Sequence, residues 1–375
     1  MAVESVHIKG VSDGFRELGY EVEFSSPPMV RVSTDKTVSQ NNLYNLIVRN
    51  LPTICYEFLA LIHNAVSLGQ CKQLLAKKNF TIIYERYAFF EFSTVFLKKK
   101  FNSFLVLEVN GAVNRKDPVH GRKIVMKALA GLLEKKMFAA ADLIVVVSSA
   151  LKHSLVEEIG VPSEKIIVTH NAVDLKKFDQ TRTGEKIRKT LQLGQKKVIG
   201  FVGSFTFWHG LGFLINSTAD LLRNDKNVHL LLVGDGRERE AISKMIEQEN
   251  LTESVTITGR VPHENIPSYI AAMDIGVMPD SNNFGSPMKI FEYMAMGKPV
   301  ISANYAPIAE VIQEGRTGYL FSPRNEIQFA KKIHLLIYNE KLRNEMGSNA
   351  CNYVKGTHTW RKNIEKIISR LPAGI

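Results

Sequence analysis

Apolar and polar positions along this chain follow the pattern of a parallel α/β protein. Short β-branched and apolar runs, each ending in a polar tip, are followed by segments whose apolar residues recur at helical spacing. A parallel sheet forms its ligand sites at the carboxyl ends of its strands, so the polar tips are the residues of interest. In the first half we expect strands at 81–84, 104–109, 142–147 and 166–169, with helices at 88–100, 121–141 and 150–159.

The amino-terminal part departs from this pattern. Residues 6–18 predict an amphipathic helix that ends at Gly19, and residues 20–24 predict a strand. An α/β domain would have a strand before that first helix, so either the first strand is missing from this sequence or the domain starts unusually. Residues 43–78 have helical spacing interrupted near Pro52. Their apolar positions are interpreted as core, with a groove for a lipid tail as the alternative: Leu46, Ile47, Ile54, Phe58, Leu59, Ile62 and Val66.

A second series of strands and helices begins at Val198, after a polar stretch at 172–196 where we place the domain junction. Its strands are expected at 198–202, 229–233, 254–258, 275–278, 299–303 and 318–321. Its helices are expected at 210–222, 237–249, 264–272, 287–296, 306–313, 325–337, 340–355 and 358–371. The fold class is therefore α/β, with two doubly wound, Rossmann-like domains that face each other across a cleft.

The stretch 284–301, FGSPMKIFEYMAMGKPVI, has the signals of a short helix followed at once by a strand. Ser286 suits the N-cap and Pro287 the first helical position, while Gly297 favours the stop. Glu292 lies off the apolar stripe, which consists of Ile290, Phe291, Met294 and Ala295. A positive helix end with one carboxylate about a turn and a half inside can bind phosphate and hydroxyl groups. The alternative is an ordinary amphipathic helix packed on a sheet.

Further candidates lie at neighbouring strand ends. Glycines follow three strands, at Gly203-Ser204, 234–236 and 259–261, where backbone amides can approach a diphosphate closely. Lys289 lies in the first turn of the helix, where a cation opposes the helix dipole, and this mismatch indicates a bound anion. His209 either donates to a phosphate or caps a helix. Arg260 either contacts a phosphate or base, or forms a surface ion pair.

Composition narrows the class of protein. The chain has 375 residues, 45% hydrophobic and 23% charged, which is enough for two globular domains. No apolar run is long enough to span a bilayer, and the start lacks the features of a signal peptide. Three cysteines without metal spacing are expected to be reduced thiols of a cytoplasmic protein. The P-loop, HExxH and GxSxG motifs are absent, so neither a metal nor a cofactor is expected.

The charge is uneven. The net charge is +11, and residues 98–136 hold ten Lys or Arg against three acids, a net charge of +7. Such a patch can bind an anionic membrane surface, a phosphorylated acceptor or nucleic acid, or can be a solvated basic face. No nucleic-acid motif accompanies it, so we expect no nucleic acid and favour a membrane or phosphate.

Several segments resemble the family-four glycosyltransferases, which have the GT-B fold. AADLIVVVSSALKHSLVEEIGVPSEKIIVTHNAVDLKKF at 140–178 resembles their interdomain segment, with Ala172 in place of a glycine. FVGSFTFWHG at 201–210 and FEYMAMGKPVISA at 291–303 resemble two further signatures. IYER at 83–86 and LEVN at 107–110 are similar to a bacterial cell-surface polysaccharide subgroup. THTW at 357–360 resembles the start of the final helix, which crosses back to the first domain.

The resemblance implies a retaining transfer of a sugar from a UDP-, GDP- or dTDP-linked donor, without a required metal. It assigns residues 1–173 to the acceptor domain, joined by helix 357–375, and residues 174–356 to the donor domain. Glu292 matches the second glutamate of the family's Glu-x7-Glu motif and would bind the ribose hydroxyls. Backbone around Ser286, Pro287, Met288 and Lys289 would contact the diphosphate or sugar, with Gly203 and Ser204 facing it. Arg260 and Val261 lie where the base is held, and the acceptor-side residues are Arg86, Asn110 and His7.

Some positions depart from the family's pattern. The first motif glutamate falls on Phe284, and the two cations that neutralise the diphosphate fall on Ser204 and His209. Asn110 stands where many members have a histidine. Our hypothesis is that His209, Lys289 and backbone amides compensate the charge that develops on the leaving diphosphate.

These features favour an enzyme that adds one sugar to a lipid-linked or growing surface glycan. Its expected location is the cytoplasm, on the inner face of the cell membrane. The competing hypothesis is a catalytically silent GT-B protein that binds nucleotide or glycan and organises a polysaccharide assembly complex. A GT-B epimerase is a third alternative, which the interdomain signatures fit less well.

Overall fold

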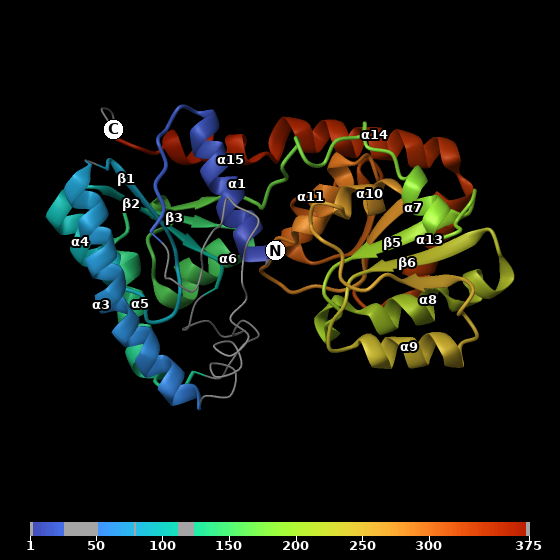
Figure 1. The fold of residues 1–375 in the computed structure, drawn as a ribbon, viewed down its shortest axis with the longest axis horizontal. Helices are drawn as coiled ribbons and strands as arrows, with labels where there is room; N and C mark the ends of the chain where they lie inside the picture. Colours follow the sequence, from blue (N-terminus) through green and yellow to red (C-terminus); the bar gives the residue numbers. More distant parts are fainter. Residues whose placement is uncertain (1–2, 26–51, 79, 112–123, 373–375) are drawn as a thin grey trace. The chain divides into compact units, whose positions relative to one another are not determined.

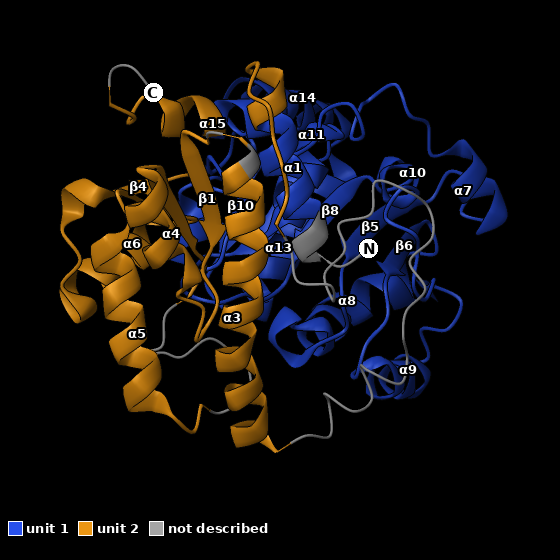
Figure 2. Ribbon diagram, turned by 60° about the vertical axis from the view of Figure 1, so that its left-hand side comes forward, with its two compact units in different colours: residues 1–14, 170–363 blue, residues 15–169, 364–375 orange. Residues whose placement is uncertain are grey.

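The computed structural model describes residues 3–25, 52–78, 80–111 and 124–372 (Figure 1). They divide into two compact units, shown in different colours in Figure 2. Unit 1 consists of residues 1–14 and 170–363, and unit 2 of residues 15–169 and 364–375. Helices α1 (Val3–Glu17) and α15 (Trp360–Ile368) therefore contribute residues to both units. Each unit contains one parallel sheet, as the sequence pattern predicts.

Unit 2 has a four-stranded sheet in the order β1-β2-β3-β4, with every neighbouring pair parallel. Strands β2 and β3 are buried along almost their whole length, as expected of a parallel sheet covered by helices. The strands are β1 (Ile82–Arg86), β2 (Phe104–Val109), β3 (Leu143–Val146) and β4 (Ile166–Val168). The helices are α3 (Thr53–Lys77), α4 (Ser93–Phe101), α5 (Lys127–Ala140) and α6 (Ser149–Ser154), which continues as a π-helical turn, Leu155–Ile159. All four predicted strands are confirmed.

Two predictions in unit 2 are wrong. Residues 20–24 form no strand, because no other described segment pairs with their backbone, and an extended segment without a partner makes no ladder. Instead, Lys78 pairs with Glu21 and Glu23 at the surface. The helix expected to begin at residue 88 begins at Ser93. Phe90 has a φ of 68°, and Asn64 fixes this turn by donating to the Phe90 carbonyl and accepting from the amide of Phe92.

The interpretation of the α3 apolar residues as core is also wrong. Five of them are exposed on the outer face of the helix: Ile54, Phe58, Leu59, Ile62 and Val66. The inner face instead carries Glu57, Asn64 and Leu75, which are buried. Leu46 and Ile47 lie outside the described residues. The helical spacing therefore predicted the helix correctly, but the apolar side of α3 is not the side that packs on the rest of the unit.

Unit 1 has a six-stranded parallel sheet in the order β10-β9-β8-β5-β6-β7. The predicted strands are all present, as β5 (Lys197–Val202), β6 (Val228–Val233), β7 (Val255–Ile257), β8 (Ile275–Met278), β9 (Val300–Ala303) and β10 (Gly318–Phe321). One face of the sheet is covered by α8 (Leu211–Asn224), α9 (Arg239–Gln248) and α13 (Glu326–Tyr338). The other is covered by α10 (Ile266–Ala271), α11 (Met288–Ala295), α12 (Ala306–Ala309) and α14 (Glu340–Thr357). The polar stretch at 172–196, where we placed the domain junction, contains one more helix, α7 (Glu185–Thr190).

The strand order of unit 1 reverses between β5 and β8. These two strands pair over only two positions, Ile199 with Ile275 and Gly200 with Gly276. The carboxyl ends of β5 and β8 beyond these positions are therefore not paired with each other. Beyond that point the amide of Val202 donates to the hydroxyl of Tyr293 on α11, at 2.7 Å. In an open parallel sheet, the point where strand order reverses is where ligands bind. The residues after β5 and β8 therefore define the candidate site.

Candidate functional site

The segments that follow β5 and β8 approach each other closely at the point where the strand order reverses, which we call the switch point. A Cβ on Gly203 would lie 2.6 Å from the Nζ atom of Lys289. A Cβ on Gly210 would lie 2.7 Å from the Cβ of Asp280, and Gly210 has a φ of 66°. These two glycines are thus required where the β5 loop contacts the residues that follow β8.

The amino end of α11 differs from the prediction. The helix begins at Met288, so Pro287 is its N-cap and Ser286 is not. The Ser286 hydroxyl instead accepts from the backbone amide of Asn171 at 3.1 Å, and no side chain caps the helix. The free amides of the first turn are therefore available to a ligand rather than to a capping side chain.

The carboxyl end of α11 ends as predicted. Gly297 has a φ of 68°, its amide donates to the carbonyl of Met294, and the amide of Lys298 donates to Tyr293. Residues 290–295 are all buried, so Glu292 is buried although it lies off the apolar stripe. A buried carboxylate is costly unless it has polar partners, so its surroundings are informative.

Those surroundings include two residues that the sequence analysis did not identify. The Nε2 atom of His263 lies 3.4 Å from the Glu292 carboxylate, and His263 Nδ1 contacts the ammonium group of Lys177. Burial lowers the pKa of Lys177, and the Glu292 charge partly opposes this effect. His263 lies only two residues beyond Val261, in a loop that was already a candidate. Its place in that loop is the feature of the sequence from which its role at the site could have been predicted.

Lys289 has the most unusual environment at the site. Its Nζ atom is buried and has no hydrogen-bond partner among the described residues. It lies over the ring of Phe201 on β5, 4.2 Å from the ring centre. Burial lowers the pKa of Lys289 to about 7, although the charge of Glu292 acts in the opposite direction. An anion at the amino end of α11 would stabilise the charged ammonium, because it would supply the missing partner.

His209 is held by the β5 loop. Its Nδ1 atom lies 2.6 Å from the carbonyl oxygen of Ser204, which is a hydrogen-bond acceptor, so Nδ1 carries the proton. Burial, and then the charge of Lys289, lower the pKa of His209 to about 3. The ring is therefore neutral at physiological pH, with Nε2 as an acceptor, and this geometry favours neither donation to a phosphate nor a second positive charge. It also does not cap α8, whose N-cap is Gly210.

The remaining donor-side candidates have simpler roles. Arg260 and Ser204 are exposed, and Val261 packs against the core formed with α10 and α11. A Cβ on Gly234 would lie 1.9 Å from the carbonyl oxygen of Gly203, and one on Gly236 would lie 2.3 Å from that of Phe205. These two glycines therefore allow close packing of the β5 and β6 loops.

The three acceptor-side candidates belong to two different units. In unit 2, Glu108 on β2 accepts from the Asn110 side chain at 2.6 Å and from the Tyr84 hydroxyl at 2.7 Å. The Nε atom of Arg86 lies 3.8 Å from the same carboxylate, and its buried Nη1 atom has no hydrogen-bond partner among the described residues. His7 belongs to unit 1, where it packs edge-on against Trp360. Within unit 2, Arg86 and Asn110 thus form a cluster at the carboxyl ends of β1 and β2.

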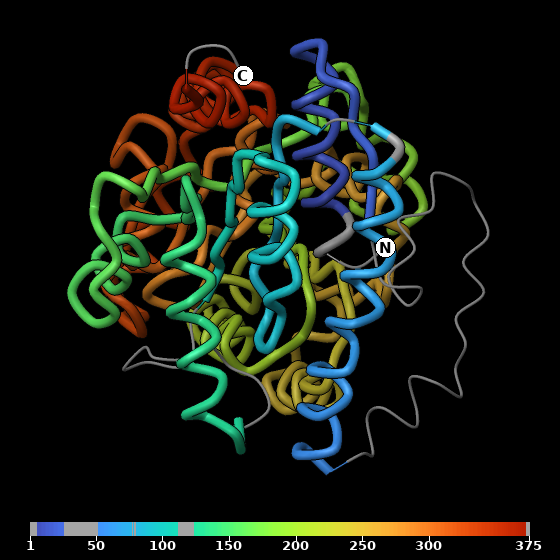
Figure 3. The backbone as a smooth tube through the Cα atoms, turned by 90° about the vertical axis from the view of Figure 1, so that its left-hand side faces the viewer, coloured from blue at the N-terminus to red at the C-terminus, as the bar shows by residue number. Residues whose placement is uncertain are grey.

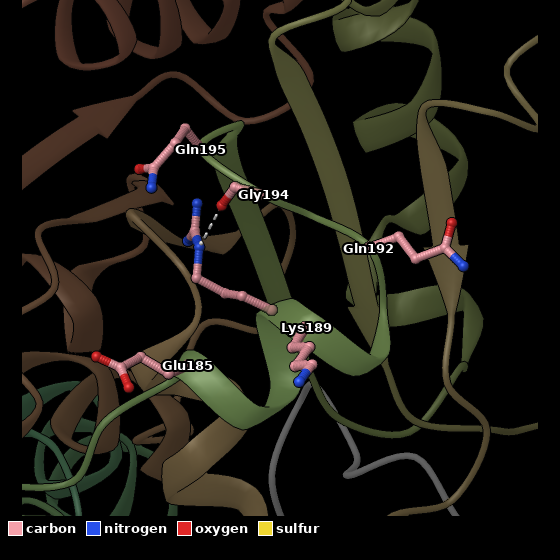
Figure 4. A pocket seen from close by; sticks show the side chains of 6 residues that line it. Glu185, Lys189, Gln192, Gly194 and Gln195 are labelled. Carbon is pink, nitrogen blue, oxygen red and sulfur yellow. Dashed lines mark hydrogen bonds between the residues drawn. The ribbon is translucent and has the colours of Figure 1, made fainter.

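A concave surface lies near α7, as Figure 4 shows, and it is not at the strand ends. It is lined by Glu185, Arg188, Lys189, Gln192, Gly194 and Gln195, just before the start of β5. Arg188 donates to the carbonyl oxygens of Gly194, Lys196 and Ala272. Its guanidinium group is thus used to hold the backbone at the amino end of the sheet.

The following three features are those of the part of the chain that the structure describes. No group of three or more His, Cys, Asp or Glu side chains is placed to hold a metal ion. No helix has both the length and the apolar character needed to cross a membrane. Cys55, Cys71 and Cys351 are free thiols.

Two family models together match most of the sequence. The family described as Glycosyltransferase Family 4 matches residues 5–177, and the one described as Glycosyl transferases group 1 matches residues 183–353. With two parallel-sheet α/β units, the chain belongs to the family-four glycosyltransferases of the GT-B type.

Curated relatives agree with this assignment. Two uncharacterized glycosyltransferases of Methanocaldococcus jannaschii are 27% and 26% identical, covering 63% and 88% of this chain and 60% and 86% of their own lengths. The capsular polysaccharide biosynthesis glycosyltransferase CapM of Staphylococcus aureus is 29% identical over 58% of each chain. The matches thus span from about three-fifths to most of the length of these relatives.

Solved structures show the same fold. Sucrose-phosphate synthase from Thermosynechococcus elongatus has a TM-score of 0.72 at 17% identity, covering 98% of this chain and 92% of its own. Anabaena HepE in complex with UDP has a TM-score of 0.65 at 20% identity, covering 81% and 82%. These similarities establish the GT-B fold.

Proposed function

We propose that this protein transfers a sugar from a nucleotide-sugar donor to a glycan acceptor, with the donor bound at the switch point of unit 1. The observation that carries the proposal is the buried ammonium of Lys289, which lacks a hydrogen-bond partner among the described residues and lies beside the open amino end of α11. A diphosphate matches this arrangement because it accepts hydrogen bonds from both. HepE, a protein of the same fold, was solved with UDP, which supports this class of donor.

In the proposed complex, Glu292 accepts from the ribose hydroxyls and Lys289 contacts the diphosphate. His263 and Lys177, which lie near Glu292, hold the carboxylate in position. The neutral ring of His209 accepts a hydrogen bond from a sugar hydroxyl or fixes the Ser204 loop. Of the three groups that we expected to compensate the charge on the leaving diphosphate, this proposal keeps Lys289 and the backbone amides and omits His209.

The reaction that we propose retains the anomeric configuration. The bond between the sugar's anomeric carbon and the diphosphate oxygen breaks, and the acceptor oxygen forms the new bond on the same face. The acceptor proton passes to the leaving diphosphate, so no protein nucleophile is required. Lys289 and the α11 amides stabilise the charge that develops on the diphosphate.

We further propose that the acceptor is a lipid-linked or growing surface glycan, bound by unit 2 on the cytoplasmic side of the cell membrane. CapM is named for capsular polysaccharide biosynthesis, which supports this class of acceptor. Arg86, held near Glu108, has a buried Nη1 atom without a hydrogen-bond partner in the described structure, and it would contact an acceptor oxygen.

A second candidate function is a catalytically silent protein that binds nucleotide or glycan within an assembly complex. The observation that favours it is the pair of positions Ser204 and Phe284, where charged residues of the family are absent.

A donor screen followed by a turnover assay tests both functions. Thermal shifts with UDP-, GDP-, dTDP- and ADP-sugars identify the donor, because a ligand that binds the folded state raises its stability. Release of the matching nucleotide diphosphate with and without glycan acceptors then measures turnover. Binding with turnover above background supports the transferase, and binding without turnover supports the silent protein. No shift with any donor would contradict the transferase and a silent protein that binds nucleotide.

A further inference from the structure

Three neighbouring helices of unit 2 expose an unusual number of large apolar side chains. Figure 3 shows α3, α4 and α5 on the side of the unit that faces the viewer. On α3 the exposed residues recur at helical spacing, and Ile62 and Phe58 are 64% and 54% exposed. The others on α3 are Ile54, Leu59 and Val66, with Phe96 on α4 and Leu129 and Leu132 on α5. Single exposed apolar residues are normal on a protein surface, but a set gathered on adjacent helices marks a contact surface.

The exposed charges on these three helices have one sign. Among their described side chains, the exposed charges are all lysines: Lys72, Lys99, Lys100, Lys127, Lys135 and Lys136. The two acids, Glu57 on α3 and Glu134 on α5, are turned inward and are 2% and 1% exposed. Four other cations of the predicted basic region, Arg115, Lys116, Arg122 and Lys123, lie outside the described residues.

Each buried acid has a structural role that accounts for its position. The Glu57 carboxylate accepts from the backbone amides of Val125 and Met126, at 2.6 and 2.8 Å, where α5 begins. This contact joins α3 to α5 and satisfies amides at the helix start. Glu134 accepts from the hydroxyl of Tyr87 at 2.8 Å. The acids of these three helices are thus used inside the unit, and their described exposed side chains are apolar, polar or positive.

We infer that the outer surface of α3, α4 and α5 docks onto an anionic lipid bilayer. The exposed Phe, Leu and Ile side chains can insert among the acyl chains at the bilayer surface. The exposed lysines of the same helices can bind the negatively charged headgroups. In this arrangement the three helices lie on the surface of the bilayer and do not cross it. A protein partner would need an acidic and apolar surface of matching shape, whereas a bilayer requires only the composition seen here. This inference is independent of the donor site in unit 1.

The experiment is vesicle co-sedimentation of the full chain. The probes are vesicles of phosphatidylcholine alone and of equal parts phosphatidylcholine and phosphatidylglycerol. The apolar variant is the double change Phe58→Glu and Ile62→Glu, and the charge variant is Lys135→Glu with Lys136→Glu. Matched controls in unit 1 are Ile327→Glu, at a position 70% exposed on α13, and Lys331→Glu with Lys341→Glu. Circular dichroism and melting temperature confirm that each variant is folded.

The expected result is binding to the anionic vesicles that weakens with salt and is much weaker on phosphatidylcholine alone. The charge variant should bind roughly 25-fold more weakly, since each lysine near an anionic surface contributes about fivefold. The apolar variant should lose at least about tenfold, and both unit 1 controls should bind as the unchanged protein does.

Three results would overturn the inference. The first is no binding to anionic vesicles. The second is equal loss in the unit 1 controls, which would show that net charge or general surface hydrophobicity governs binding. The third is a dimer that is abolished by Phe58→Glu with Ile62→Glu in the absence of vesicle binding, which would show that this surface joins two copies of the chain.

Discussion

The ammonium nitrogen of Lys289 lies 4.2 Å from the centre of the Phe201 ring and has no hydrogen-bond partner among the described residues. A cation over an aromatic face is attracted to it, but this attraction replaces only part of the lost hydration. Lys289 is also in the first turn of α11, where the helix dipole opposes a positive charge. The ligand-free protein therefore maintains an unfavourable charge that an anion would stabilise.

Lys289→Met should weaken donor binding without reducing stability. Methionine fills similar space and removes the cost of a buried ammonium, so the melting temperature should stay unchanged or rise. The affinity for the nucleotide diphosphate should fall at least about tenfold, as for loss of a charge-assisted contact. Calorimetric titration and thermal unfolding of the same samples measure both quantities. A fall in stability with unchanged affinity would show that the lysine has a structural role only.

Stability should depend on pH through Lys289. Its pKa is about 7 in the folded protein against an ordinary value of 10.5, so between these pH values the unfolded chain holds a proton that the folded chain lacks. Stability conferred by this group therefore rises with pH across that window, by at most about 1.4 kcal/mol per pH unit. Denaturant unfolding of the unchanged protein and of Lys289→Met, from pH 7 to 10, measures the difference between their free energies of unfolding. Parallel curves would contradict the low pKa.

Donor binding should follow the opposite trend. A diphosphate favours the charged ammonium, so binding above pH 7 takes up a proton and the affinity falls as pH rises. His209 does not contribute, because its pKa of about 3 keeps it neutral in this range. Calorimetry of UDP binding at pH 8 in buffers of different ionisation enthalpy measures the proton uptake. It should be absent in Lys289→Met, and equal uptake in both proteins would assign the proton to another group.

Gly203→Ala should displace Lys289. The new Cβ would lie 2.6 Å from Nζ, and Gly203 has a φ of 154°, which a residue with a Cβ rarely adopts. We expect donor affinity to fall about as far as in Lys289→Met, with a stability loss of about 1–3 kcal/mol from the strained backbone. In the double variant the two losses should not add, because both act on one contact. Additive losses would mean that Gly203 contacts the donor directly.

Tyr293→Phe should reduce the stability of unit 1 at the switch point. The Tyr293 hydroxyl accepts from the buried amide of Val202, where β5 has separated from β8. Removing it leaves that amide without a partner, at a cost of about 1–3 kcal/mol. Urea unfolding measures this cost. A change below a few tenths of a kcal/mol would show that another group satisfies the amide.

The sequence predicted every strand of the two described sheets, because buried parallel strands give continuous apolar runs with polar ends. The strand expected at 20–24 failed because its alternation is local, whereas a strand also needs a partner at its side. The exposed stripe of α3 was misread for a related reason. Periodicity shows that a helix has an apolar face, but it does not show whether that face meets the protein or the solvent.

The site was predicted in outline and not in its contacts. Lys289 was identified from its conflict with the helix dipole, and Gly297 from its position after the last helical turn. The pairing of Ser286 with Asn171 joins residues 115 positions apart, and no local pattern encodes it. The role of Tyr293 depends in the same way on the separation of β5 and β8, which only the assembled sheet shows.

The measurement that tests the donor site most directly is calorimetric titration of the preferred nucleotide diphosphate into the unchanged protein and into Glu292→Ala. Ile327→Glu, on the exposed face of α13, serves as the control. The proposed ribose contact predicts at least about tenfold weaker binding for Glu292→Ala, with a parallel fall in kcat/KM, and no change in the control. Equal affinity of all three proteins would remove Glu292 from the donor site and contradict the proposed ribose contact.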